Sequence, residues 1–315
     1  MEASTGAELP EGNDWQYEPK WDGFRCIAFR DEDEVQLQSK AGEPLARYFP
    51  EVTEALLAVH AKHFVVDGEI FLPSFDNLLQ RIHPAASRIA KLSKETPASL
   101  VVFDLLVDER RRVIADQPLR ERRPALEAFA ERYFPGNERI QLSPATCDVA
   151  KAREWLASVG VKLDGVVAKR LDLPYQTGNR EGMVKVKNMR TADCVVGGFR
   201  YAAKGNLVGS LLLGLYDAEG LLHHVGFCSA IPTADKPELT GKLEKLRKAP
   251  GFTGRAPGGP SRWSTERSTE WEPLDPVLVV EVRYDHFSGG RFRHGTKLMR
   301  WRPDKAPAQC LLPPA

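Results

Sequence analysis

The sequence predicts an α+β protein with two domains, a larger mixed one followed by a smaller one rich in strands. Before residue 190, strand-like stretches are interrupted by helical ones, without the regular alternation of a doubly wound parallel sheet. After residue 190, short strands dominate and one helical stretch interrupts them. A chain of 315 residues is long enough to bury two cores. We therefore place the domains at residues 1–190 and 191–315.

The first domain is expected to combine mixed or antiparallel sheets with helices. Residues 1–13 are small and polar, and we expect them to be disordered. Two strands are expected between residues 14 and 40. Later strands are expected at 63–72, 100–107, 165–170 and 183–187, and helices at 51–62, 76–82, 121–133 and 148–159.

The second domain is expected to be a small barrel. Its predicted strands lie at 194–201, 208–216, 222–228 and 276–284, and its predicted helix lies at 238–248. About five short strands with one helix between the third and the fourth are the layout of an OB-type Greek-key barrel.

Composition limits the class of protein and its compartment. The net charge of +1 does not by itself indicate a partner that is a polyanion. Five widely separated cysteines, without a Cys-x-x-Cys pair, favour a reducing cytosol over a disulfide framework. No apolar run approaches the roughly 18 to 20 residues that a membrane span needs. We expect a cytoplasmic monomer with no membrane association.

One basic stretch stands out near the end of the chain. Six cations lie between residues 291 and 305, and Asp304 is the one acid among them. A solvated face and a phosphate-binding surface are both compatible with such a run.

The stretch most suggestive of catalysis is residues 17–25, Tyr-Glu-Pro-Lys-Trp-Asp-Gly-Phe-Arg. Lys20 can act as a nucleophile only when its ammonium group loses a proton. Gly23 permits a sharp turn or a close approach to a ligand, and the planar guanidinium of Arg25 suits a phosphate or a sugar hydroxyl. A hairpin turn with a solvated lysine is the alternative interpretation.

Six motifs in order give this stretch its context. They are Lys20-Trp21-Asp22-Gly23-Phe24-Arg25, Val66-Asp67-Gly68-Glu69, Phe103-Asp104, Asp164-Gly165-Val166-Val167-Ala168-Lys169, Val184-Lys185-Val186-Lys187 and Arg302-Pro303-Asp304-Lys305. With them the chain resembles the ATP-dependent DNA ligases, in particular the small two-domain bacterial ones, over residues 15 to 310. The wider family of covalent nucleotidyltransferases includes RNA ligases and mRNA capping enzymes.

The resemblance implies catalytic roles for Lys20, Asp22, Lys185 and Lys187. Lys20 would be the nucleophile that becomes adenylated. Lys185 and Lys187 alternate along one strand, so their ammonium groups point to one face, where the family binds the α-phosphate. An edge strand protected by lysines is the other interpretation of this pair.

The resemblance also implies a set of nucleotide-binding and metal-binding residues. Glu18 would accept from the adenine amino group, Phe103 would stack on adenine, Lys169 would meet a phosphate, and Arg25 and Glu69 would lie near the ribose and phosphates. Lys40 would hold the 5′-phosphate of a nick. Arg302, Asp304 and Lys305 would form a mobile lid that orients the pyrophosphate. Glu69 and Asp164 would bind Mg²⁺ or Mn²⁺, and Asp164, where the family more often has Glu, could do so through water.

The predicted function is sealing of nicks in duplex DNA with ATP, through a lysyl-AMP and a 5′-adenylated DNA, in DNA repair. The alternatives are an RNA ligase or capping-type nucleotidyltransferase with the same chemistry, and a non-catalytic OB-type nucleic-acid-binding protein.

Overall fold

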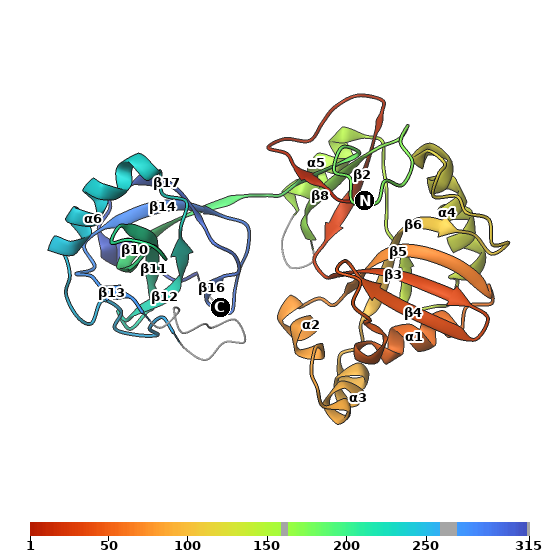
Figure 1. Cartoon of the computed structure of the whole chain (residues 1–315), viewed down its shortest axis with the longest axis horizontal. Coiled ribbons are helices and arrows are strands. Elements are labelled where there is room, and N and C mark those ends of the chain that lie inside the picture. The colour runs from red at the N-terminus through yellow and green to blue at the C-terminus, as the bar shows by residue number, and fades with distance from the viewer. Residues whose placement is uncertain (159–162, 259–269, 314–315) are drawn as a thin grey trace. The chain divides into compact units, whose positions relative to one another are not determined.

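The computed structural model describes residues 1–158, 163–258 and 270–313. The chain divides into two compact units, Met1–Asn188 and Met189–Ala315 (Figure 1). Each unit has its own hydrophobic core. Helices combine with mainly antiparallel sheets, so the predicted α+β class is confirmed. In the part of the chain that is described, no helix is long and apolar enough to cross a membrane.

The first unit contains two sheets. A five-stranded sheet has the order β4-β3-β5-β6-β7, and a four-stranded sheet has the order β1-β9-β8-β2. The strands are β1 (Ser4–Thr5), β2 (Trp15–Trp21), β3 (Phe24–Asp31), β4 (Glu34–Ser39), β5 (His63–Phe71), β6 (Ser99–Val107), β7 (Ile140–Leu142), β8 (Leu163–Arg170) and β9 (Met183–Val186). Pairing is antiparallel except between β6 and β7 and between β1 and β9.

The described residues of the first unit also form five α-helices (Figure 1). They are α1 (Pro50–Leu57), α2 (Phe75–Arg81), α3 (Ala86–Glu95), α4 (Leu119–Tyr133) and α5 (Val149–Ala157). Helix α4 packs on β6, and α5 packs on β2 and β8. Helix α3 was not expected from the sequence, and Ile89 is its one buried residue. The expected end of the fifth helix, at residue 159, lies outside the described residues.

The beginning of the chain corrects one expectation. Residues 1–13 were expected to be disordered, but Ser4 and Thr5 form β1 and pair in parallel with β9. The backbone amide of Glu2 donates to the carbonyl of Asn179 (2.9 Å), and Met1 is buried. The open edge of β9 provides backbone partners that a composition-based prediction does not consider.

The passage from β2 to β3 connects the two sheets and depends on Gly23. Residues 14–40 form three strands rather than two, and Lys20 lies inside β2. A Cβ atom at Gly23 would lie 2.2 Å from the carbonyl oxygen of Ile70, so no larger residue fits. The close approach that this glycine permits is therefore to β5, the strand that carries Glu69.

The second unit contains a six-stranded antiparallel sheet, in which five strands have the order β12-β11-β10-β14-β17 and β13 pairs with β10, and a separate β15–β16 hairpin. Its elements are β10 (Arg190–Tyr201), β11 (Val208–Tyr216), β12 (Leu222–Cys228), α6 (Lys236–Lys245), β13 (Glu272–Pro273), β14 (Val279–Tyr284), β15 (Phe287–Ser288), β16 (Arg291–Phe292) and β17 (Lys297–Trp301). The helix follows the third strand, which confirms the predicted OB-type layout. Strand β17 comes from the basic stretch, whose charges hid its strand pattern.

Candidate active site

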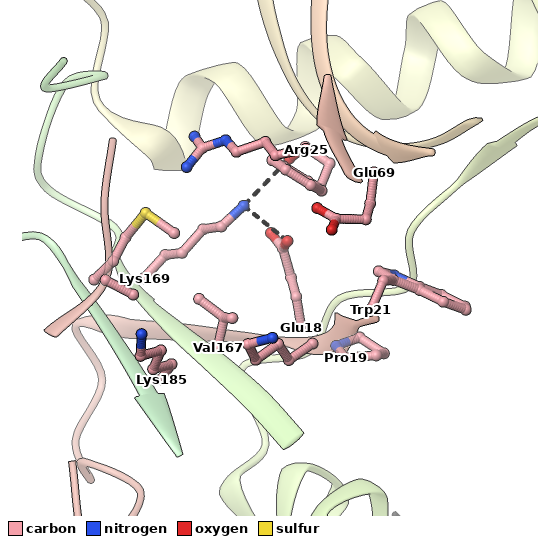
Figure 2. A pocket seen from close by; sticks show the side chains of 12 residues that line it. Glu18, Pro19, Trp21, Arg25, Glu69, Val167, Lys169 and Lys185 are labelled. Carbon is pink, nitrogen blue, oxygen red and sulfur yellow. Dashed lines mark hydrogen bonds and ion pairs between the residues drawn. The ribbon is translucent and has the colours of Figure 1, made fainter. Parts of the chain in front are cut away.

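A pocket in the first unit gathers residues from both sheets around Lys20 (Figure 2). Six other predicted residues line it, namely Glu18, Arg25, Glu69, Phe103, Lys169 and Lys185. They come from β2, β3, β5, β6, β8 and β9. Residues that are up to 167 positions apart in sequence thus meet where the two sheets face each other.

Lys20 shares one carboxylate with a second lysine. Its Nζ donates to Oδ2 of Asp164 at 2.5 Å, and Nζ of Lys187 lies 3.0 Å from the same oxygen. Burial raises the pKa of Asp164, but the charges and hydrogen bonds of the two lysines outweigh burial and leave the pKa below its ordinary value. Asp164 therefore stays ionised and holds both ammonium groups in place.

Lys185 adds a further positive charge to this end of the pocket. It faces Val167 across the β8–β9 pair. Burial, followed by the like charges of Lys20 and Lys187, lowers the pKa of Lys185. A cluster of three lysines around one carboxylate is suited to binding a polyanion such as a triphosphate.

At another part of the pocket, a buried carboxylate is held by two donors. Oε2 of Glu18 lies 2.8 Å from Nζ of Lys169, and Oε1 accepts from Nε2 of Gln16 at 2.8 Å. Nζ of Lys169 also lies 4.5 Å from the ring centroid of Phe103 and donates to its carbonyl oxygen at 3.5 Å. The ammonium of Lys169 is thus directed at Glu18 and Phe103, the two residues that were expected to recognise adenine.

Arg25 is fixed by a buried network that includes Asp67 and Tyr175, to which the sequence analysis assigned no role. Its Nε and Nη2 donate to the two oxygens of Asp67 at 3.1 and 2.6 Å. The hydroxyl of Tyr175 donates to Oδ2 of Asp67 at 2.7 Å and accepts from Nη2 of Arg25 at 3.2 Å. Nη1 of Arg25 donates to the carbonyl of Met1.

Asp67 and Tyr175 differ in how far the sequence could have predicted their positions in the site. Asp67 lies two residues before Glu69 on β5, so strand parity could have placed both on one face. Tyr175 lies in the connection between β8 and β9, where no periodic pattern indicates its direction.

Glu69 is a further acid of the pocket. It faces Arg25 across the β3–β5 pair. Burial raises the pKa of Glu69 to about 8, although Lys20 and Arg25 act in the opposite direction. Glu69 and Asp164 both lie beside Lys20, and their oxygens are the ligand type that Mg²⁺ prefers. Among the described residues, no group of three or more His, Cys, Asp or Glu is placed to hold a metal ion.

Two predicted residues lie at the margin of this pocket. Asp22 is in the turn between β2 and β3. Lys40 follows β4, lines a neighbouring cavity together with Arg25 and Tyr175, and forms an ion pair with Glu2 at 3.3 Å.

The remaining predicted residues form a cluster in the second unit. Nη1 of Arg302 donates to both oxygens of Asp193 at 2.9 and 3.1 Å, and Nζ of Lys305 donates to Oδ2 of Asp193 at 2.7 Å. Nε and Nη2 of Arg302 donate to Asp304 at 3.0 and 2.8 Å. Asp193 was not predicted, because it lies on β10, far from the motif in sequence.

Comparison with known families agrees with this fold and site. The family model of the ATP dependent DNA ligase domain matches residues 4–187, and that of the ATP dependent DNA ligase C terminal region matches residues 204–305. The chain therefore belongs to the ATP-dependent DNA ligases, and the predicted family, enzyme class and nucleotide, ATP, are confirmed.

Individual relatives are bacterial ligases. The chain is 43% identical to DNA ligase C1 of Mycolicibacterium smegmatis, over 98% of this chain and 91% of the relative. It is also 43% identical to DNA ligase C of Mycobacterium tuberculosis, over 94% of this chain and 88% of the relative. The multifunctional non-homologous end joining DNA repair protein LigD of Mycobacterium tuberculosis is 29% identical over 95% of this chain, which spans 37% of that relative.

Solved structures support the fold. A Lig E DNA ligase, from a study of DNA binding with a minimal scaffold, has a TM-score of 0.58 at 15% identity, over 96% of this chain and all of that one. At such low identity the similarity concerns the fold alone.

Proposed function

We propose that this ligase seals nicks in duplex DNA in three steps, with residues 1–190 as the adenylation domain and residues 191–315 as an OB domain. The observation that carries the proposal is the position of the Lys20 amine, which lies beside Asp164 in a pocket with Lys185, Arg25 and Glu69. An amine surrounded by cations and acids in this way is equipped to attack a phosphoryl group.

In the first step, Nζ of Lys20 forms a bond to the α-phosphorus of ATP, and the bond from that phosphorus to the pyrophosphate oxygen breaks. Asp164, at 2.5 Å, orients the amine and is within reach of the proton that the amine must lose. Lys185 and Lys187 neutralise charge that develops on the phosphate oxygens. A divalent metal, Mg²⁺ or Mn²⁺, would be held by Glu69 and Asp164 and would supply further charge neutralisation.

Selection of adenine rests on Glu18 and Phe103. A carboxylate accepts from the amino group of adenine, whereas guanine presents a carbonyl at that place. Phe103 offers a ring face for stacking. Lys169, predicted to meet a phosphate, is instead proposed to hold the Glu18 carboxylate, because the two are 2.8 Å apart.

The later steps use the nucleic acid. An oxygen of the 5′-phosphate at the nick attacks the phosphorus of lysyl-AMP and releases Lys20. The 3′-hydroxyl then attacks that 5′-phosphate and releases AMP. Lys40 is proposed to bind the 5′-phosphate, and Asp22 to support the catalytic turn beside Lys20. The OB domain would hold the duplex mainly through its backbone, so binding should weaken with salt.

The setting is proposed from the relatives and the composition. The relative LigD is named as a DNA repair protein. We propose that this ligase likewise acts in DNA repair, as a monomer in the bacterial cytosol.

Sealing assays on matched nicks test the proposal. The protein should seal a DNA nick with ATP, and Lys20→Ala should not. Arg302→Ala and Lys305→Ala should lose nucleotide attachment yet seal a nick that already carries 5′-AMP, because the lid is needed only in the first step. Sealing of RNA nicks alone would support the RNA ligase alternative. Nick binding without any nucleotide attachment would support the non-catalytic one.

A further inference from the structure

We propose that Asp193 is a positioning residue of the first step, which holds Arg302 and Lys305 together as one cationic group. This inference rests on the proposed function of those two residues as the lid. It concerns the second unit alone, and it assigns a role to a carboxylate outside all six motifs.

The first argument is the geometry of the carboxylate. Both oxygens of Asp193 accept from Nη1 of Arg302, at 2.9 and 3.1 Å, and Oδ2 also accepts from Nζ of Lys305 at 2.7 Å. One side chain thus fixes the distance between two cations that lie three residues apart in sequence. Without it, two long flexible side chains of like charge would tend to separate.

The second argument is the rigidity of the support. Asp193 is near the start of β10, where it pairs with Glu281 on β14, and β14 in turn pairs with β17. The backbone amide of Arg302 donates to the carbonyl of Val279 at 2.8 Å. A carboxylate on a paired strand is held more precisely than one on a loop, so it can orient the side chains that it binds.

The third argument is partial burial. The side chains of Asp193, Arg302 and Lys305 are 15%, 20% and 27% exposed. Ion pairs that are largely removed from water are weakened less by salt than pairs on the open surface. The cluster is therefore able to keep its geometry at physiological ionic strength.

The fourth argument counts donors. A guanidinium has five N–H groups and an ammonium has three. Within the described residues, Arg302 uses Nε, Nη1 and Nη2 toward Asp193 and Asp304, and Lys305 uses its ammonium toward Asp193. Nη2 of Arg302 has a second N–H and the ammonium of Lys305 has further ones, so the pair can bind phosphate oxygens while it stays on Asp193.

Asp193→Asn is the test, because it keeps the shape and removes the charge. We expect the single-turnover rate of AMP attachment to fall by about tenfold or more, since the two cations lose their common anchor. Sealing of a pre-adenylated nick should stay within about twofold, because that reaction does not need the lid. Asp193→Glu, which restores the charge, should recover part of the lost rate.

The matched control is Asp275→Asn in the same unit. Asp275 accepts from Lys248 at 3.0 Å, so the same chemical change is made at a different ion pair. This variant should leave both reactions unchanged, and melting temperatures of all variants establish that they are folded.

The outcomes separate the inference from the function on which it rests. If Arg302→Ala and Lys305→Ala lose AMP attachment while Asp193→Asn does not, the inference is overturned and the lid stands. Equal losses on the ordinary and the pre-adenylated nick would indicate a structural role for Asp193 and would also overturn it. If Arg302→Ala and Lys305→Ala attach AMP normally, the proposed lid itself is wrong and the inference falls with it.

Discussion

Nζ of Lys20 and Oδ2 of Asp164 lie 2.5 Å apart, although the two residues are 144 positions apart in sequence. Lys20 is on β2 and Asp164 on the neighbouring strand β8, where Lys20 pairs with Gly165. A Cβ atom at Gly165 would lie 2.1 Å from the carbonyl of Val186, so glycine is required there. The two motifs are therefore parts of one local structure.

Two replacements of Asp164 should distinguish the contribution of its charge to AMP attachment from that of its side-chain shape. Asp164→Asn should slow AMP attachment to Lys20 by about 100-fold, because the amine loses its ionised partner. Asp164→Glu should retain most of the rate, since it keeps the charge and matches the residue more common in the family. Rapid-quench measurement of AMP attachment at saturating ATP and Mg²⁺ gives both rates. Equal rates for the Asn variant and the unchanged protein would exclude this role.

Tyr175→Phe should weaken ATP use without unfolding the protein. It removes the hydroxyl that binds Asp67 and Arg25, so the Arg25 guanidinium is held by fewer contacts. The loss of these two hydrogen bonds should lower kcat/KM for ATP by about three- to tenfold, mainly through KM. Tyr133→Phe on α4 is the matched control. A change in melting temperature with unaltered kinetics would show that Tyr175 serves stability alone.

Lys169→Met distinguishes two roles for this lysine. If Lys169 holds Glu18, the variant should lose discrimination between ATP and GTP by about tenfold, because the carboxylate that recognises the amino group is no longer fixed. If Lys169 meets a phosphate, attachment from both nucleotides should fall by the same factor. Intact-mass measurement with each nucleotide gives the ratio, and an unchanged ratio would contradict the proposed role.

His224 should make the second unit sensitive to acid. Burial, with the charges of Arg291, Arg200 and Arg255, lowers the pKa of His224 from 6.5 to about 3. Between these values the unfolded chain binds one more proton at this residue than the folded chain does. Its contribution to stability is thus complete above pH 6.5 and is lost as the pH falls toward 3, by at most about 1.4 kcal/mol per pH unit.

Urea unfolding of the full chain at pH 7, 6 and 5 checks this dependence. As the pH is lowered from 7 to 5, the free energy of unfolding should decrease more steeply for the unchanged protein than for His224→Gln, which carries no titrating ring. Parallel slopes for the two proteins would show that His224 is protonated equally in the folded and unfolded states.

The sequence predicts which residues form this site better than it predicts their hydrogen-bond and ion-pair partners. Strand alternation and motif order lead to Lys20, Glu69 and Lys185, because residues on one face of a strand are two positions apart. The partner of each group depends on tertiary contacts between distant segments. Tyr175 is in an aperiodic connection and Asp193 is an isolated acid on a strand, so neither gives a local pattern to detect.

The fold, like the site, was predictable only where the sequence carries a local pattern. The OB-type order was predictable from short strands and one helix, whereas β1 and β17 were not. Residues 4–5 become a strand because β9 offers an open edge, and the basic stretch at 297–301 becomes one because β14 does. In both places pairing with a neighbouring strand determines the conformation, and local strand propensity does not predict such pairing.

Attachment of AMP to Lys20 is the central claim, and intact-mass spectrometry tests it most directly. The protein is first treated with pyrophosphate to remove bound AMP, and is then incubated with ATP and Mg²⁺ beside Lys20→Ala and a GTP control. The account predicts a gain of one adenylyl group with ATP only, and none in the variant. A gain that persists in Lys20→Ala, or no gain in the unchanged protein, would contradict it.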